Sequence, residues 1–513
     1  MIDIPSMDYA EETKRILNRL GNYELIVVSD GEPYIHTRTW EGIICKTTAG
    51  GLTTALNPVM QTCGGVWVAR GSGDADRAAV NENNEVMVPP DNPKYTLRRV
   101  FLNKEEIDGY FNGFSNQMWW PLCHNVFVKP RFNPIFYTLY KRVNEKFAES
   151  AISELGDKKP LVWVQDFHLT LVPGMIRKES DEALLAYFWH IPWPAHTVFR
   201  IVPWRREIME SMLENTLIGF HTSQDCRNFL LTAENEIEGS KIDWNRMTVT
   251  RDGRITFVRA FPISVDYKSI DALKTSATVK REEEVIEKRF DCPIGVGIDR
   301  IDYIKGLPEK FSAIDRFLFK YPEYQSKFTF VQTVILERPR VPEFLELDRR
   351  LDSLVDDLNW RYSTETWKPV EYMKEKMEFT RIVAMYKKAK VCIISSLNDG
   401  LNIVCKEFIS SQDVSDPGVL ILSEFAGAAE ELGDDALLIN PYDIESFSDT
   451  IKQALEMPFE ERKKRMERLQ KKVGENDIFK WTSNIFKGMS EVIPIAKAMR
   501  DRRLYRMKGR DWL

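Results

Sequence analysis

The sequence predicts an α/β protein made of two domains with mainly parallel sheets. Three observations support this prediction: short apolar runs recur along the chain, amphipathic helical stretches lie between them, and the chain has 513 residues. Continuous apolar runs suit strands that are covered on both faces, and strands that alternate with helices form parallel sheets. The length exceeds what one ordinary hydrophobic core holds, so two domains are expected.

The apolar runs fall into two groups, one in each half of the chain. The predicted strands of the first half are 25–28, 65–69, 161–164, 184–189 and 217–220. Those of the second half are 294–298, 328–331, 391–394, 419–422 and 436–439. Residues 310–320 are the clearest helix between strands, because Phe311, Ile314, Phe317 and Leu318 share one face.

The domain boundary is predicted near residues 262–275, where a strand-like segment gives way to a short helix and a charged run. We therefore expect a first domain over 1–265, a second over 266–475, and a helical tail over 476–513. The sequence leaves open whether the tail packs back on the first domain. Open α/β sheets bind ligands at the carboxyl ends of their strands, so functional residues are expected directly after strands, in a cleft between the domains.

Composition excludes several functions. Lys plus Arg total 71 and Asp plus Glu total 77, a formal net charge of −6, without the basic excess typical of a nucleic-acid partner. The seven cysteines are dispersed and include no CxxC pair, which indicates reduced thiols and a cytoplasmic location. The N-terminal segment is too polar for a signal peptide, and no apolar run is long enough to cross a bilayer, so no membrane partner is expected.

Two cations follow the predicted strand 294–298. Arg300 offers a bidentate fork and Lys305 a point charge, and the next residue, Gly306, allows close backbone approach. This combination suits a diphosphate. An isolated pair with this spacing is more often a solvated surface loop, so the interpretation depends on its neighbours.

A second polar segment follows the predicted strand 391–394. Asp399 lies in a turn, and Asn402 fits a helix cap that leaves backbone N–H groups directed at an anion. The carboxylate of Asp399 could accept hydrogen bonds from sugar hydroxyls, and that of Glu407 from ribose hydroxyls. Taken singly, these carboxylates read as ordinary turn or surface groups. The predicted donor-binding residues of this segment are Asp399, Gly400, Leu401, Asn402, Ile403 and Glu407.

Polar residues also follow strands in the first half. Asp166 comes just after 161–164 and His190 directly after 184–189, so both could face the same cleft. A core histidine satisfied by the backbone is an equal alternative for His190. Gly51 belongs to a glycine turn before a helix, which by itself is a weak indication of a phosphate contact.

Taken together, these segments resemble the trehalose-6-phosphate synthase family of retaining glycosyltransferases. The matching segments occur in the family's order: AGGL (49–52), GFSN…WP (113–121), VQDFHL (164–169), HIPWP (190–194), IGFHT (218–222), DRIDYIKGLPEKF (299–311), NDGLNIVCKEF (398–408) and VLILSEFAGAAEEL (419–432). The resemblance covers roughly residues 50–440. It implies the GT-B architecture, in which two Rossmann-like domains face each other across a cleft.

The resemblance implies transfer of glucose from UDP-glucose, or a similar nucleotide sugar, to glucose 6-phosphate, giving trehalose 6-phosphate. In the family the leaving phosphate oxygen deprotonates the attacking hydroxyl on the same face, without a protein nucleophile. By this likeness Arg300 and Lys305 neutralise the leaving diphosphate, so neither a metal nor a cofactor is expected. His190 and Asp399 complete the implied catalytic set.

The remaining implied roles concern binding. Gly51 would lie against the diphosphate, and Glu407 would bind the ribose. The implied acceptor-binding residues are Trp120, Asp166 and Arg338, of which Arg338 would reach the acceptor phosphate.

Two positions depart from the family pattern. The family's first strand is followed by Ser-Asn-Arg, whose arginine touches the acceptor phosphate, whereas Ser29, Asp30 and Gly31 stand here. Phe111 replaces a tyrosine of the same pocket. Cations that could substitute are Arg70, Arg77, Lys94, Arg98 and Arg99.

Alternatives to the implied function are left open. The chain also resembles the glucosylglycerol-phosphate synthase branch, which uses glycerol 3-phosphate, and a catalytically weak regulator that binds sugar phosphates is a third reading. A nicotinamide oxidoreductase would need a G-x-G-x-x-G segment after Val28, and none follows. The sequence does not fix the nucleobase of the donor or the oligomeric state, so a homo-oligomer is neither predicted nor excluded.

Overall fold

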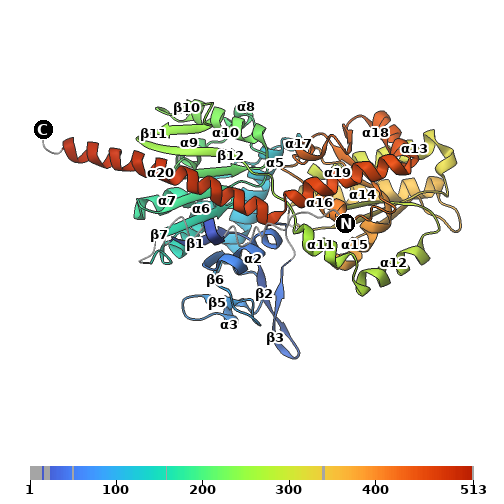
Figure 1. Ribbon diagram of the computed structural model, residues 1–513, viewed down its shortest axis with the longest axis horizontal. Helices are drawn as coiled ribbons and strands as arrows, with labels where there is room; N and C mark the ends of the chain where they lie inside the picture. Colours follow the sequence, from blue (N-terminus) through green and yellow to red (C-terminus); the bar gives the residue numbers. More distant parts are fainter. Residues whose placement is uncertain (1–13, 17–22, 49–50, 157–158, 338–340, 511–513) are drawn as a thin grey trace. The chain divides into compact units, whose positions relative to one another are not determined.

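The computed structural model describes residues 14–16, 23–48, 51–156, 159–337 and 341–510 (Figure 1). These residues form two compact units. Unit 1 runs from Ile263 to Ile478, and unit 2 combines the described residues up to Pro262 with those from Phe479 onward. The chain therefore builds most of unit 2, then unit 1, and returns to unit 2 in its last helix.

Unit 1 contains a six-stranded sheet in which every neighbouring pair is parallel. Numbered along the unit, its strands lie in the order 3-2-1-4-5-6, which is the doubly wound arrangement of dinucleotide-binding folds. The order reverses between β13 and β16, which is the point where folds of this kind bind their ligands. From edge to edge the strands are β15 (Val370–Met373), β14 (Thr329–Ile335), β13 (Ile294–Arg300), β16 (Ala389–Ile394), β17 (Val419–Ser423) and β18 (Leu437–Ile439).

Helices of unit 1 alternate with these strands, as the sequence pattern predicts. They are α11 (Tyr267–Leu273), α12 (Ala277–Arg289), η3 (Tyr303–Lys305), α13 (Leu307–Lys320), η4 (Pro322–Tyr324), α14 (Pro342–Tyr362), α15 (Phe379–Lys388), α16 (Ile403–Ser411), α17 (Ala429–Leu432), α18 (Ile444–Glu456) and α19 (Phe459–Glu475).

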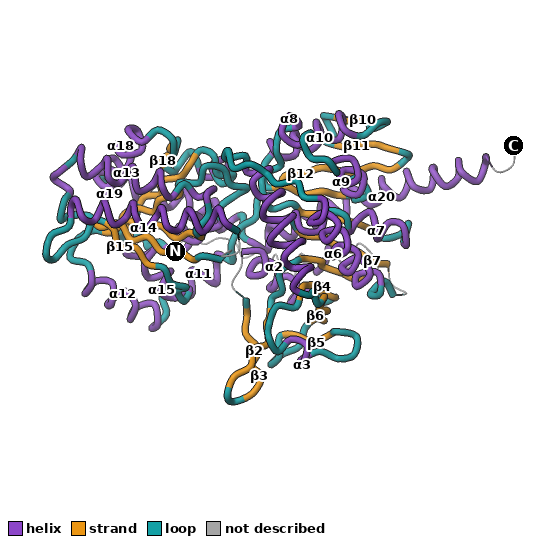
Figure 2. Tube along the Cα trace, turned by 180° about the vertical axis from the view of Figure 1, so that it is seen from behind, coloured by secondary structure: helices purple, strands orange, loops and turns teal. Residues whose placement is uncertain are grey.

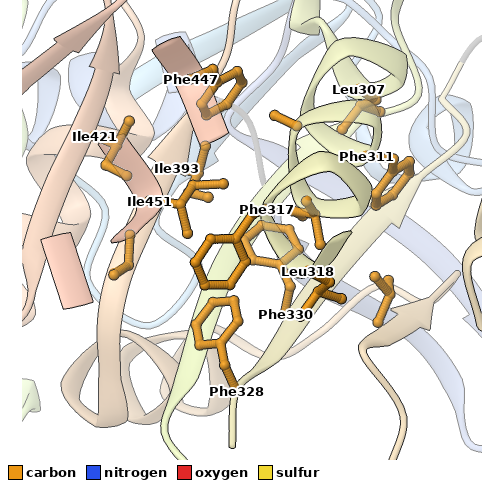
Figure 3. Packing of buried hydrophobic residues seen from close by; sticks show 14 of the residues in the cluster. Leu307, Phe311, Phe317, Leu318, Phe328, Phe330, Ile393, Ile421, Phe447 and Ile451 are labelled. Atoms are coloured by element: carbon orange, nitrogen blue, oxygen red, sulfur yellow. The ribbon is translucent and has the colours of Figure 1, made fainter. Parts of the chain in front are cut away.

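The apolar face of α13 lies in the core of unit 1 (Figure 3). Phe311, Ile314, Phe317 and Leu318 are at most 1% exposed, so the predicted helix face is confirmed. The ring of Phe317 meets the ring of Phe328 edge-on, with centroids 5.9 Å apart. Burial of one such side chain contributes about 1.5–3 kcal/mol, so these contacts hold α13 firmly against the sheet.

Unit 2 contains a ten-stranded sheet whose seven central strands, from β6 to β12, are parallel. Its edge strands β5, β10 and β11 pair antiparallel. The strand order reverses between β1 and β7. In sheet order the strands are β10 (Lys241–Asp243), β11 (Thr248–Arg251), β12 (Arg254–Ala260), β9 (Leu217–Phe220), β8 (Leu184–Phe188), β7 (Lys159–Gln165), β1 (Tyr23–Ser29), β4 (Val66–Arg70), β6 (Tyr95–Val100) and β5 (Glu85–Val88).

A separate hairpin of unit 2 consists of β2 (Tyr34–Thr39) and β3 (Gly42–Thr47). Figure 2 shows strands gathered inside each unit with helices around them. The helical segments of unit 2 are α2 (Gly51–Cys63), α3 (Asp76–Ala79), α4 (Lys104–Glu106), the π-helix η1 (Ile107–Trp119), α5 (Trp120–His124), α6 (Pro134–Ile152), η2 (Phe167–Leu169), α7 (Val172–Glu179), α8 (His196–Phe199), α9 (Arg205–Met212), α10 (Ser223–Glu236) and α20 (Ile478–Arg510).

The last helix, α20, lies against the sheet of unit 2 (Figure 1). The ring of Trp481 lies 5.6 Å from that of Trp163 and 5.0 Å from that of Phe188, and its indole N–H donates to the carbonyl of Phe261 at 3.0 Å. Further along α20, the guanidinium of Arg503 pairs with Asp181 at 2.7 Å. Apolar and ionic contacts thus attach both halves of α20 to unit 2.

Two further observations concern the chain's surroundings. Within the described ranges, no helix combines the length and the apolar stretch that a membrane crossing needs. All seven cysteines lie in these ranges as free thiols.

Candidate active site

The turn after β13 is fixed by its own side chains and by the neighbouring strand. Asp302 accepts a hydrogen bond from the N–H of Ile304 at 3.3 Å and so caps η3. Gly306 has φ of 61°, and a Cβ there would lie 2.1 Å from the carbonyl oxygen of Ser395, so only glycine fits. Ser395 in turn donates to the carbonyl of Lys305 at 2.9 Å. The turn after β13 is therefore locked to the end of β16.

Lys305 and Asp399 meet where the strand order of unit 1 reverses. The ammonium of Lys305 lies 2.5 Å from Oδ2 of Asp399, and both side chains are nearly nine-tenths buried, with exposed fractions of 12% and 13%. The same oxygen accepts from Oγ of Ser396 at 3.1 Å and from Nδ2 of Asn402 at 3.2 Å. Residues from two separate loops, 94 positions apart, thus form one charged centre.

Arg300 is the last residue of β13 and so also lies at the carboxyl ends of the strands. Its guanidinium is 3.4 Å from Glu337 and 3.8 Å from Asp302. Burial lowers the pKa of Arg300, but the carboxylates of Asp302, Glu337 and Asp399 raise it by more, so the group stays charged. The side chain is 32% exposed, which leaves it accessible to an anion from solvent.

The segment after Asp399 forms the helix start that the sequence predicts. Asn402 caps α16, because its side chain accepts from the N–H of Cys405 at 3.2 Å. Asn402 also has φ of 85°, a strained conformation for a residue other than glycine. Such strain is characteristic of ligand sites, where the surrounding structure holds it in place. The first N–H groups of α16 therefore belong to a rigid, preformed turn.

Glu407 lies one turn into α16 and has an unusual acidity. Burial raises its pKa to about 7, while a hydrogen bond from the hydroxyl of Tyr386, at 3.4 Å, opposes the shift. The carboxyl group therefore changes its charge near neutral pH. Tyr386 is a partner that the sequence did not indicate.

In unit 2, His190 and Asp166 lie next to each other, after the neighbouring strands β8 and β7. The backbone N–H of His190 donates to Oδ1 of Asp166 at 3.2 Å. Burial, and then the neighbouring ring of His221, lower the pKa of His190 well below its usual value, so the imidazole is neutral. Asp166, directly after β7, has φ of 66° and is, like Asn402, a strained residue other than glycine.

Gln165 is a partner of His190 that the sequence analysis missed. Its Oε1 lies 2.9 Å from Nε2 of His190, and the side chain is fully buried. A neutral imidazole carries its proton on one nitrogen, and a fixed amide neighbour decides which one. A glutamine at the end of a buried strand gives no signal that distinguishes this role.

The remaining residues that the sequence analysis assigned to binding lie on several different elements. Gly51 is the first residue of α2, and Leu401 and Gly400 are buried in the turn before α16. Trp120 is 5% exposed, and its ring packs on His124 and Phe167 with centroids 4.2 and 5.8 Å away. Arg338 lies outside the described residues.

A model of the family described as glycosyltransferase family 20 matches residues 23–491. The chain belongs to glycosyltransferase family 20. It is therefore a glycosyltransferase by family, and the expected resemblance to trehalose-6-phosphate synthases is confirmed.

Two relatives of this chain are named as UDP-forming trehalose-phosphate synthases. The chain is 33% identical over 484 residues to the UDP-forming alpha,alpha-trehalose-phosphate synthase A of Dictyostelium discoideum, covering 94% of this chain and 64% of that protein, so it spans less than two thirds of this longer relative. It is 32% identical over 485 residues to the UDP-forming synthase of Candida albicans, covering 93% of this chain and 99% of that protein.

A solved structure resembles the fold. The UDP-forming synthase of Burkholderia xenovorans, in complex with glucose-6-phosphate, superposes with a TM-score of 0.81 at 28% identity, over 91% of this chain and 99% of that one. The predicted α/β class with mainly parallel sheets, in the GT-B form, is confirmed by this match and by the two sheets.

The residues after β1, where the sequence analysis finds a departure from the family pattern, belong to an ion-paired aromatic group. Arg70 makes a bidentate ion pair with Asp30, with two N–H···O distances of 2.9 Å, and Tyr110 donates to Asp30 at 3.1 Å. The guanidinium of Arg70 lies 5.0 Å above the ring of Phe111, which stacks on His168. Tyr110 and Phe111 belong to a π-helix, a form found often at functional sites.

The other candidate arginines have different partners. Arg99 is fully buried and pairs with Glu32 at 2.9 Å and with Asp76 at 3.0 Å. Arg98 pairs with Glu154, and Arg77 lies over the ring of Phe101. Among the arginines considered as replacements, Arg70 is the one that pairs with Asp30, the residue directly after β1.

Proposed function

We propose that the chain transfers glucose from UDP-glucose to glucose 6-phosphate and releases UDP, which gives trehalose 6-phosphate. The observation that carries this proposal is the charged centre of Lys305 and Asp399 beside Arg300, at the strand-order reversal of unit 1. Relatives named as UDP-forming trehalose-phosphate synthases support the same donor and acceptor.

Unit 1 is the proposed donor-binding domain. Arg300 and Lys305 are the cations for the diphosphate, since one provides a planar fork and the other a point charge. When the diphosphate takes Lys305, Asp399 loses its ion pair and becomes free to accept hydrogen bonds from the donor sugar. The start of α16, including Ile403, offers N–H groups to the donor, and Glu407 binds the ribose.

Unit 2 is the proposed acceptor-binding domain. His190 is the proposed neighbour of the reacting sugar, where a neutral imidazole donates or accepts a hydrogen bond without opposing positive charge. Asp166 and Trp120 are the proposed acceptor contacts, and Gly51 the proposed contact to the diphosphate. Arg338 keeps its proposed role at the acceptor phosphate on the strength of the resemblance.

The chemistry proposed for this site is electrostatic. The leaving phosphate oxygen takes the proton of the attacking hydroxyl on the same face, so the configuration at the anomeric carbon is retained. The enzyme's part is to hold the acceptor in line and to stabilise the charge that develops on the diphosphate. One well-placed donor to such a charge contributes about 3–4 kcal/mol in the transition state. A cytoplasmic setting, where both phosphorylated substrates are produced, completes the proposal.

A second acceptor is favoured by one observation. The bidentate pairing of Arg70 with Asp30, over Phe111 instead of a tyrosine, gives this end of unit 2 a different charge arrangement. Transfer from the same donor to another phosphorylated acceptor, such as glycerol 3-phosphate, would use the same unit 1 cluster.

One assay separates these functions. The protein is incubated with UDP-glucose and, in parallel, with glucose 6-phosphate, glycerol 3-phosphate or no acceptor, and UDP release is followed. Release with glucose 6-phosphate is expected. Release with glycerol 3-phosphate alone would replace the first acceptor by the second, and no release with any phosphorylated acceptor would refute the transferase proposal.

A further inference from the structure

A cationic pocket lies in unit 2 at the amino ends of its parallel strands, whereas His190 lies at their carboxyl ends. Residues 181–183 precede β8, residues 213–216 precede β9, and Arg254 is the first residue of β12. Because these strands are parallel, the pocket and His190 lie at opposite ends of β8, about 16 Å apart for a five-residue strand. The pocket is thus distinct from the candidate active site.

Two adjoining cavities, of about 50 and 180 Å³, make up this pocket. Leu213, Glu214 and Arg254 line both of them. The larger cavity exceeds the roughly 30 Å³ share of one water molecule several-fold, which is room for a phosphoryl group with a small body attached.

The walls of the pocket carry more positive than negative charge. Four acidic side chains line the two cavities: Asp181, Glu182, Glu214 and Asp252. Six cationic side chains face them: Arg177, Arg251, Arg254, Lys497, Arg500 and Arg503. The last three belong to α20, so the helix closes the pocket.

At the centre, three guanidinium groups share two carboxylates. Arg503 pairs with Asp181 at 2.7 Å, and Arg254 pairs with Asp181 and also with Glu214 at 3.3 Å. Arg177 lies 3.6 Å from Glu214. These three guanidinium groups therefore outnumber the carboxylates that they share by one, while Arg251 pairs with Glu210 and Asp252, and Arg500 pairs with Asp501.

Arg177 is the guanidinium group whose pKa shows the effect of this excess of positive charge. Its side chain is 9% exposed, and its N–H groups donate to the carbonyls of Asp181 at 2.8 Å and Glu214 at 3.1 Å. Burial, and then the charge of Arg254, lower its pKa to about 10. A buried cation with this shortage of negative charge is stabilised by any anion that enters the pocket.

Unpaired polar atoms gather at the same place. In the described part of the chain, three buried donors here have no hydrogen-bond partner, the Nε atoms of Arg177, Arg500 and Arg503, and so do two buried acceptors, Oε2 of Glu214 and Oδ1 of Asn215; only the donors favour an anion. A buried unpaired polar group costs about 1–3 kcal/mol, so native structures rarely collect several of them in one spot. An oxyanion supplies acceptors and negative charge to such a group of arginines, and guanidinium forks match its oxygens.

We propose that this pocket binds a phosphoryl oxyanion, either inorganic phosphate or the phosphate group of a small metabolite. The anion is held by arginines of α7 and β12 on one side and by the cations of α20 on the other. Its binding therefore fastens α20 to the sheet. The proposal does not depend on the proposed transferase function.

The test uses the full chain and inorganic phosphate, with chloride added to hold the ionic strength constant. The unfolding temperature is followed during the titration, in an Arg300→Ala/Lys305→Ala background that weakens phosphate binding at the candidate active site. A parallel titration with glycerol 2-phosphate distinguishes a phosphate ester from free phosphate as the natural source.

The decisive variant is Lys497→Gln/Arg500→Gln. Arg500 pairs with its neighbour Asp501 at 3.5 Å and Lys497 lies over the ring of Tyr23 at 5.5 Å, so the three-arginine centre stays intact. The control is Lys487→Gln/Arg502→Gln, the same charge change at exposed positions of α20 that do not line the cavities.

We expect saturable stabilisation by phosphate in the background protein and in the control, and at least a tenfold weaker half-saturation in Lys497→Gln/Arg500→Gln. Two results would overturn the proposal: a phosphate effect no larger than that of chloride, or an equal effect in the two double variants.

Discussion

The protonation of Glu407 controls the pH dependence of donor binding in the proposed function. The carboxyl group has a pKa of about 7, because it is buried beside Tyr386. If the ribose hydroxyls bind the ionised form, a proton and the donor compete for this side chain. The affinity for UDP should then fall as the pH drops below 7.

The magnitude follows from that pKa. At pH 5.5 only about 3% of the carboxyl groups are ionised, against about 90% at pH 8, so UDP binds up to about 30-fold more weakly, or about 2 kcal/mol. In Glu407→Gln this dependence is absent. Wild type should therefore bind UDP more tightly than the variant at pH 8, and the two affinities should converge at pH 5.5.

Isothermal titration calorimetry with UDP, at pH values from 5.5 to 8, measures both proteins. UDP itself titrates in this range, but its ionisation affects wild type and Glu407→Gln equally, so the ratio of the two dissociation constants isolates Glu407. A ratio that stays constant with pH would refute the assignment of Glu407 to the ribose.

Three further predictions concern stability and the neutral histidine. Because the pKa of Glu407 is raised, the folded state keeps a proton that the unfolded state releases near pH 4.5, so the free energy of unfolding falls between about pH 4.5 and 7. At pH 8 Glu407→Gln should therefore be more stable than wild type by up to about 3 kcal/mol and unfold at a higher temperature. At pH 4.5 the two proteins should unfold at the same temperature. Lys310 is fully buried and donates to Asp299 at 2.8 Å, so Lys310→Met should destabilise unit 1 by about 3–5 kcal/mol in thermal unfolding, and an unchanged melting curve would contradict this ion-pair role. Gln165→Glu places a carboxylate beside His190 and should raise the pKa of the imidazole, which a new ionisation in the pH–rate profile would report; an identical profile would exclude this contact.

Much of the unit 1 cluster could be predicted from sequence, because its residues are local. Arg300 is the last residue of one strand and Lys305 lies five residues further on, and Asp399 follows another strand. In a parallel sheet the carboxyl ends of strands lie at one edge, so residues in these loops come together. The helix cap at Asn402 was predictable for the same reason, since it depends on a few consecutive residues.

Contacts between distant residues could not be predicted. The strand β6 was missed because Arg98 and Arg99, near its end, break the apolar pattern. The structure buries Arg99 by pairing it with Glu32, 67 positions earlier. Lys310 was read as the start of an amphipathic helix, yet it is buried against Asp299 and Gln332. A pattern of apolar residues cannot reveal which charges will find a partner across the sheet.

The structure also shows what surrounds the two positions that depart from the family pattern. After the first strand, where the family resemblance leads one to expect an arginine, Asp30 forms an ion pair with Arg70, which lies over the ring of Phe111. Sequence alone named Arg70 as one of several replacement cations. In the structure Arg70 and Arg99 are both paired, but Arg99 is completely buried between Glu32 and Asp76, whereas the side chain of Arg70 keeps 17% exposure beside Asp30.

The most direct test of the proposed function is the product formed from UDP-glucose and glucose 6-phosphate, followed by proton NMR in wild type, Arg300→Ala, Lys305→Ala and the surface control Lys376→Met. Wild type and the control should form trehalose 6-phosphate with both anomeric protons in the α configuration. Each cation variant should remain folded and lose about 100-fold or more of the rate, the loss expected for one donor to a developing charge. Near-wild-type product formation in both cation variants, or a β linkage in wild type, would contradict the proposed function.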